Sequence, residues 1–114
     1  KGTHINAIGS FKPEMQEIDP DIIQASRVYF DDRAACIKES GDFTKAAEAG
    51  RLVDDNIIGE IGECVLKTIP GRISPDDITL FKSVGTAIQD LVIADNIFDK
   101  SRLEHFGEEI RYYE

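Results

Sequence analysis

Hydrophobic residues follow two kinds of pattern along the chain, short apolar runs and apolar residues at helical spacing. Short apolar runs bounded by turn residues predict strands at Lys1–Gly9, Arg27–Phe30 and Ile78–Lys82. The longest helical pattern spans Thr86–Lys100, where apolar residues recur every three or four positions. The final apolar segment, Glu109–Tyr113, predicts a terminal strand.

Helices are predicted between these strands from their start signals. Asp19 precedes a proline, and this pair is typical of a helix start, because aspartate caps the helix and proline fits its first position. Asp32 is expected to cap a second helix, Arg33–Glu39. Helical patterns of apolar residues also cover Phe43–Ala49 and Ile57–Thr68.

This order of elements predicts an α/β fold. Strands that alternate with helices indicate parallel βαβ units, so we expect three strands in one parallel sheet with helices on its faces. The terminal strand Glu109–Tyr113 either pairs at the edge of this sheet or belongs to a sheet supplied elsewhere.

Composition narrows the class of protein. The chain has 114 residues, 41% of them hydrophobic, and a formal net charge of −9, which disfavours binding to nucleic acids or anionic membrane surfaces. It contains no apolar run of membrane-spanning length, and no basic region followed by an apolar stretch marks a signal peptide. Cys36 and Cys64 are interpreted as small core residues in a reducing cytoplasm, and no metal site is expected. Because the first residue is Lys1, we expect a piece of a longer protein.

Nucleotide-binding signatures are missing from this α/β pattern. The chain has no G-x-G-x-x-G fingerprint, no P-loop and no Gly-x-Ser-x-Gly elbow. Gly59 and Gly62 lie in a helical pattern and are interpreted as sites where a helix packs closely on the sheet. The pattern is therefore that of a ligand-binding sheet without a phosphate grip.

Four segments carry a family resemblance. They are GTHINAIGSFKPEMQEID at Gly2–Asp19, KESGD at Lys38–Asp42, GEIGE at Gly59–Glu63 and LFKSVGTAIQDLVIA at Leu80–Ala94. In this order and spacing they resemble the ornithine cyclodeaminase/mu-crystallin family, which includes ornithine cyclodeaminases, archaeal-type alanine dehydrogenase and ketimine reductases.

The resemblance implies a C-terminal fragment of a two-domain enzyme. Residues 1–85 then form the second half of a Rossmann-type NAD(P)-binding domain. Residues 86–114 form a helix and strand that return to a dimerisation and substrate domain. The parent would use NAD or NADP and act on a small amino acid or imine. The phosphate fingerprint and the substrate-binding Arg and Lys residues would lie upstream, so this chain alone is expected to be inactive.

The resemblance also implies roles for individual positions, and no catalytic residue is assigned. Cofactor contacts are expected from the loop after the first strand and from the turn before the long helix: Ile8, Gly9, Ser10, Phe11 and Ser83. Substrate contacts are expected from Glu39, Val84 and Gly85, the last two at a helix start with free N–H groups. Ser83 is equally interpreted as a helix N-cap, and Glu39 as a solvated residue at a helix end.

Phe11 departs from part of the family. Ornithine cyclodeaminases keep an aspartate there, and a phenyl ring cannot act as a general acid or base. Phe11 thus favours a dehydrogenase or imine reductase, in which hydride transfer is the difficult step. His4 is a replacement acid or base, or a structural histidine, and His105 has the same structural interpretation. Lys82 is expected to point to solvent or to a surface carboxylate.

Three functional hypotheses remain open. The first is the fragment of an NAD(P)-dependent oxidoreductase or deaminating cyclase just described. The second is a stand-alone interaction module that pairs through an exposed sheet edge. The third is a subunit that assembles with a separately encoded N-terminal half. Exposed apolar surface on a partial domain also predicts a homo-oligomer.

Overall fold

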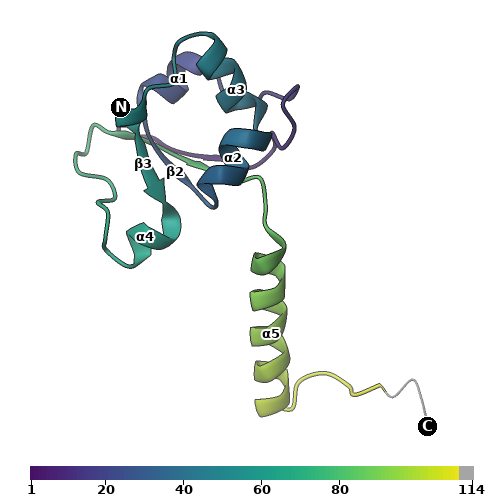
Figure 1. Ribbon diagram of the computed structural model, residues 1–114. Helices are drawn as coiled ribbons and strands as arrows, with labels where there is room; N and C mark the ends of the chain where they lie inside the picture. Colours follow the sequence, from purple (N-terminus) through teal and green to yellow (C-terminus); the bar gives the residue numbers. More distant parts are fainter. Residues whose placement is uncertain (111–114) are drawn as a thin grey trace.

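A four-stranded parallel sheet forms the centre of the computed structural model, which describes residues 1–110; Figure 1 shows the sheet with its surrounding helices. Across the sheet the strands follow the order β1 (His4–Ala7), β4 (Ile78–Lys82), β2 (Ser26–Phe30) and β3 (Ile57–Glu60). All three pairings between neighbouring strands are parallel. The predicted α/β class and three predicted strands are therefore confirmed, and a fourth strand was missed.

The missed strand lies where one helix was predicted. Residues Ile57–Glu60 form β3, and only Ile61–Val65 form a helix, α4. Apolar residues at this spacing fit either structure, and pairing with β2 decides the outcome. Gly59 lies in the strand with φ +152°, and an added Cβ would be 2.6 Å from Glu63 Oε2. Gly62 has nothing within 4 Å of an added Cβ, so its interpretation as a close-packing position is wrong, whereas Gly59 does lie close to a helix residue but from a strand and not from a helix.

Three short helices begin close to their predicted positions. In α1 (Pro20–Gln24) the Asp19 side chain accepts a hydrogen bond from the Asp21 N–H. In α2 (Arg33–Glu39) the Asp32 side chain accepts one from the Ala35 N–H. The third helix, α3 (Gly41–Glu48), begins at Gly41, two residues before its predicted start. Local capping signals thus set where α1 and α2 begin, whereas α3 has no side-chain cap hydrogen bond.

The core lies between the sheet and these helices. Phe30 of β2 and Phe43 of α3 pack edge to face, with ring centroids 5.0 Å apart. Edge-to-face packing is a favoured aromatic geometry, and both rings are almost fully buried. The remaining core side chains are Ala7, Ile23, Val28, Cys36, Ala46, Ile57 and Leu80.

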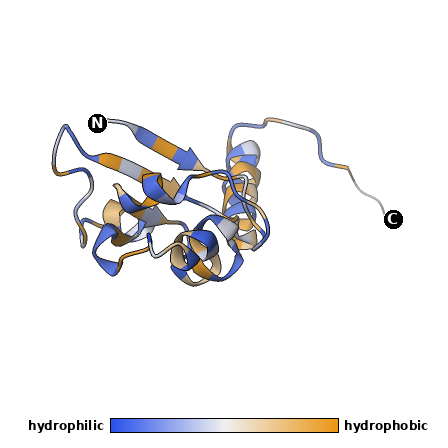
Figure 2. Ribbon diagram, turned by 90° about the horizontal axis from the view of Figure 1, so that it is seen from above, coloured by the Kyte–Doolittle hydropathy of each residue, from blue (hydrophilic) through white to orange (hydrophobic). Residues whose placement is uncertain are grey.

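The long helix α5 (Ala87–Leu103) projects away from this body (Figure 1). The radius of gyration is 18.2 Å, against about 13 Å for a compact domain of this length. None of the residues of α5 is buried, and its apolar residues Leu91, Ile97 and Phe98 are 64%, 59% and 59% exposed. Viewed from above, the helix is seen end-on and carries hydrophobic and hydrophilic positions (Figure 2).

The predicted terminal strand Glu109–Tyr113 falls largely outside the described residues, and its described part, Glu109 and Ile110, is not in a strand. Among residues 1–110, no helix combines the length and apolar character needed to cross a membrane.

Candidate functional site

Three loops meet at the carboxyl edge of the sheet, because β1, β4 and β2 are neighbours. Ala7 at the end of β1 and Phe30 at the end of β2 both pair with Lys82 at the end of β4. The ladder continues past the strands, since the Ser83 N–H donates to the Ala7 carbonyl and the Asp31 N–H to the Lys82 carbonyl. In open α/β sheets this edge is where ligands bind.

Asp31 holds the turn that follows β4. Its Oδ2 accepts hydrogen bonds from Ser83 Oγ at 2.6 Å and from the Gly85 N–H at 3.2 Å, and its Oδ1 accepts one from Cys36 Sγ at 3.0 Å. Burial alone would raise the pKa of the Asp31 carboxyl, but the hydrogen bonds from Ser83, Cys36 and backbone N–H groups outweigh it and lower that pKa. Asp31 was not among the site residues predicted from the sequence.

The expected helix start at Val84 and Gly85 is wrong. The N-cap of α5 is Thr86, and the helix begins at Ala87. Gly85 has φ +83°, a left-handed conformation that favours glycine, and its N–H donates to Asp31 and to Ser83 Oγ. Ser83 therefore caps no helix, and its N-cap interpretation is wrong as well.

Two of the predicted substrate residues, Val84 and Glu39, are not among those whose side chains line the carboxyl edge of the sheet. The side chain of Val84 packs against the hydrophobic core. Glu39 is exposed at the last position of α2, beside Ser40, whose Oγ lies 3.4 Å from Ser10 Oγ. Glu39 therefore precedes a residue that reaches the loop after β1, while its own side chain is exposed.

The loop after β1 presents two apolar side chains to solvent. Ile8 is 71% exposed and Phe11 is 49% exposed. Between them, the N–H groups of Gly9 and Ser10 donate to Glu17 Oε1 at 2.8 and 3.0 Å. Ser10 is buried, and its hydroxyl donates to the Met15 carbonyl at 3.2 Å. The structure therefore brings the predicted residues Ile8, Gly9, Ser10, Phe11, Ser83 and Gly85 to one edge.

Lys82 is fully buried, so the prediction that it points to solvent is wrong, and of the two carboxylates that it binds only that of Glu17 is partly exposed. The Lys82 Nζ lies 2.7 Å from Glu17 Oε1 and 3.2 Å from Asp42 Oδ2, and the Asp42 side chain is 1% exposed. A buried ammonium is tolerated because two carboxylates compensate its charge. Burial tends to raise the pKa of Glu17, but hydrogen bonds from Lys82, Ser10 and Gly9 hold that pKa below its ordinary value.

Asp42 connects this ion pair to the far end of the same loop. Its Oδ1 accepts hydrogen bonds from the N–H groups of Glu17 and Ile18 at 2.7 and 3.0 Å. The hydroxyl of Ser40 donates to its Oδ2 at 3.3 Å. Sequence reasoning identified neither Asp42 nor Glu17, because no short-range pattern links them to Lys82.

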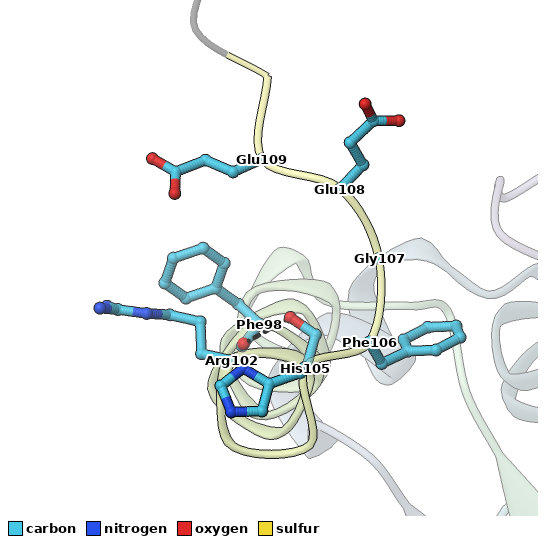
Figure 3. Close-up of a pocket in the computed structure, with 8 residues that line it drawn as sticks. Phe98, Arg102, His105, Phe106, Gly107, Glu108 and Glu109 are labelled. Atoms are coloured by element: carbon cyan, nitrogen blue, oxygen red, sulfur yellow. Dashed lines mark hydrogen bonds between the residues drawn. The ribbon is translucent and has the colours of Figure 1, made fainter.

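The two histidines lie away from the carboxyl edge. The ring of His4 lies 2.8 Å from Thr79 Oγ1 and 3.1 Å from Asn6 Oδ1. It stands at the start of β1, about 10 Å from the strand's carboxyl end. His105 lies just beyond α5 and lines an open concavity of about 830 Å³ (Figure 3). Its walls are Phe98, Ser101, Arg102, His105, Phe106, Gly107, Glu108 and Glu109, and none of these was predicted to bind a ligand.

Comparison with known proteins confirms the family resemblance. Residues 1–104 match the profile of the ornithine cyclodeaminase/mu-crystallin family. The chain is 36% identical over 113 residues to a Delta(1)-pyrroline-2-carboxylate reductase of Bacillus cereus. This alignment covers 98% of this chain and 35% of that protein. The chain is 33% identical to the alanine dehydrogenase of Archaeoglobus fulgidus, covering 99% of this chain and 35% of that protein.

Solved structures of related enzymes have the same fold. The Delta(1)-pyrroline-2-carboxylate reductase of Thermococcus litoralis, in complex with NADH and L-proline, matches with a TM-score of 0.85 and 32% identity, over 96% of this chain and 34% of that one. An archaeal alanine dehydrogenase dimer with bound NAD matches with a TM-score of 0.80 and 32% identity, over 98% and 35%. The predicted α/β, Rossmann-type class is thereby confirmed. The chain spans about 35% of the length of the curated relatives it matches.

Proposed function

Because the chain belongs to the ornithine cyclodeaminase/mu-crystallin family, we propose that it is the nicotinamide-side part of an NAD(P)-dependent oxidoreductase acting on a small amino acid or imino acid. The observation that carries this proposal is the carboxyl edge of the sheet. There the turn that Asp31 holds at Ser83 is hydrogen-bonded to the end of β1, and the loop that follows β1 exposes the side chains of Ile8 and Phe11. Relatives with the same fold bind NADH or NAD.

The residues at this edge fit a nicotinamide ring better than a phosphate group. Ile8 and Phe11 offer apolar surface, on which a flat ring can pack. The proton of the Ser83 hydroxyl is committed to Asp31, and one lone pair of Ser83 Oγ accepts from the Gly85 N–H, so its second lone pair is left to accept from an amide N–H. NAD(P)H, when bound, supplies a hydride. The phosphate-binding part of the site is proposed to come from chain outside these residues, because G-x-G-x-x-G is missing here.

Phe11 supports reduction over deaminating cyclisation. A phenyl side chain neither accepts nor donates a proton, so this position cannot serve as general acid or base. The loop can still orient a ring and exclude water, which is what hydride transfer needs from it. The substrate class is an imine or α-amino acid, as in the reductase crystallised with L-proline.

The proposed division of the chain follows from where α5 stands. Residues 1–85 are proposed to complete a Rossmann-type domain whose first half pairs with the free edge of β1. Residues 86–114 are proposed to reach a second domain or a second copy of the chain. The exposed side chains of α5 support this, since a helix with unburied Leu91, Ile97 and Phe98 gains by docking. The same feature favours the alternative of a complementing subunit.

A chimera tests the proposal. The matching third of the Bacillus cereus reductase is replaced by this chain, and NADH binding is followed by the change in cofactor fluorescence. Saturable binding and NADH-dependent reduction of pyrroline-2-carboxylate are expected. A folded chimera that binds no NADH, beside a parent reductase that does, would contradict the proposal. Phe11→Asp is expected to lower the reduction rate while leaving the chimera folded, since it puts a charge where a ring should pack.

A further inference from the structure

A network of three charged side chains, two of them buried, is hydrogen-bonded to the loop after β1. Lys82 is fully buried, the Asp42 side chain is 1% exposed and the Glu17 side chain is 30% exposed. A buried ion pair contributes little net stability compared with apolar residues of similar size, because removing charges from water is costly. Stability alone therefore gives a weak reason for charged groups at this place.

One oxygen atom joins the buried ammonium to the loop backbone. Glu17 Oε1 accepts from Lys82 Nζ at 2.7 Å and from the N–H groups of Gly9 and Ser10 at 2.8 and 3.0 Å. The carboxylate lies so close to the loop that a Cβ added at Gly9 would be 2.7 Å from Glu17 Oε2. The position of Lys82 thus sets the position of Glu17, which sets the backbone between Ile8 and Phe11.

Asp42 holds the opposite end of the loop against the same ammonium. Its carboxylate binds Lys82 Nζ at 3.2 Å and accepts the N–H groups of Glu17 and Ile18. Lys82 is also the last residue of β4, next to Ser83. The buried Lys82 Nζ therefore links the loop after β1 to the turn after β4.

We propose that Lys82 is a positioning residue: acting through Glu17, it fixes the Gly9 and Ser10 amides, and so orients Ile8 and Phe11 for the nicotinamide ring. The role in cofactor binding rests on the function proposed above. The role in fixing the loop stands on the contacts alone. The two parts are separable by experiment.

The first measurement is hydrogen exchange in this chain. Glu17→Ala removes the acceptor and is the main variant, because its side chain is partly exposed. Exchange at the Gly9 and Ser10 amides is expected to rise about tenfold, the effect of losing a hydrogen bond to a charged group. Amides in the centre of β2 serve as an internal reference and should keep their protection. Unchanged exchange at Gly9 and Ser10 would overturn the proposal.

The second measurement compares cofactor affinity with turnover in the chimera. Glu17→Ala and Lys82→Met are expected to raise KM for NADH about tenfold with a smaller change in kcat, because they loosen a binding surface and remove no reacting group. Glu17→Gln keeps the Oε1 acceptor and should recover most of the affinity. Lys38→Met, on the exposed side of α2, is the matched control and should leave KM unchanged.

The outcomes separate the two proposals. If the chimera without substitutions binds no NADH, the proposed function fails, and hydrogen exchange alone decides whether Lys82 fixes the loop. If that chimera binds NADH but Glu17→Ala leaves KM unchanged, the positioning role is refuted and the proposed function survives. Should Lys82→Met fail to fold, Glu17→Ala and Glu17→Gln supply the same comparison.

Discussion

Gly41→Ala is a sharp test of how tightly α3 packs against the loop after β1. Gly41 is the first residue of α3, and its N–H donates to the Lys12 carbonyl at 3.1 Å. A Cβ added there would lie 2.0 Å from the Met15 carbonyl oxygen and 2.3 Å from that of Pro13. Both obstacles are backbone atoms, so no side chain can rotate to make room.

The magnitude follows from the displacement that this clash requires. Carbon and oxygen atoms that are not bonded need more than 3 Å, so the loop or the helix must move by about 1 Å. Overpacking of this kind costs about 1–3 kcal/mol. The shift also weakens the hydrogen bond from Gly41 and the one that Ser10 Oγ makes to Met15, each worth about 1 kcal/mol. We expect a total loss of about 2–5 kcal/mol in the free energy of unfolding.

Urea unfolding followed by circular dichroism measures this loss, with Gly62→Ala as the matched control. Gly62 also stands in the first turn of a helix, α4, but nothing lies within 4 Å of its added Cβ. That variant should match the original chain or gain about 0.5–1 kcal/mol from the better helix propensity of alanine. If Gly41→Ala unfolds at the same urea concentration as Gly62→Ala, the close approach of α3 to the loop is refuted.

Three further predictions concern a thiol, a carboxylate and α5. Burial, together with the Asp31 carboxylate, raises the pKa of Cys36 to about 12, so about one Cys36 thiol in ten thousand is ionised at pH 8. Iodoacetamide should therefore label Cys64 well before Cys36 in the folded chain, which mass spectrometry can follow. Equal labelling rates for the two thiols would contradict this prediction. The pKa of Glu17 is lowered on folding, so its stabilising contribution is complete above the ordinary pKa and is lost as pH falls through the lower, folded pKa. The difference in urea midpoint between the original chain and Glu17→Gln should therefore shrink from pH 7 to about pH 3.5. A difference that stays constant over this range would contradict the assigned role of the Glu17 carboxylate. The exposed apolar side chains of α5 should make the isolated chain self-associate. Leu91→Glu should then shift the molar mass measured by light scattering towards that of the monomer. If the original chain is already monomeric, self-association through α5 is refuted.

Elements with strong local signals were predictable from the sequence. Asp19 and Asp32 form the side-chain caps expected of them, and the predicted helix at Arg33–Glu39 has the observed bounds. The strand at Ile78–Lys82 was also predicted with its observed bounds. In each case a polar cap or turn residue borders an apolar run, so the information lies within a few residues.

Features that depend on distant partners were not predictable in this way. The strand β3 forms because Ile57–Glu60 pairs with β2, whereas its apolar spacing alone fits a helix. Lys82 is buried because Glu17, 65 residues earlier, reaches its ammonium. A lysine that ends an apolar strand is a weak signal of burial at best.

The candidate site divides along the same line. The resemblance pointed to the loop at Ile8–Phe11 and to Ser83, and these are brought to one edge of the sheet, while their roles in binding stay predictions. Asp31, which holds Ser83, was missed although an acidic residue directly after a parallel strand is a recognisable signal at this edge. Glu17 and Asp42 had no such signal, because both act through contacts that only the folded chain creates.

The strand order also has a consequence for when the chain can fold. The last strand, β4, lies between β1 and β2, so His4 pairs with Thr79 and no contact between β1 and β2 can stand in for it. Pairing of segments so far apart is slow, because a long loop must close first. During synthesis, the edge of β1 that pairs with β4 therefore stays without its partner until β4 has been made. A product truncated before Lys82 would lack the ammonium that binds Glu17 and Asp42 and would leave β1 and β2 without their common neighbour, so it should be recognised by chaperones or proteases.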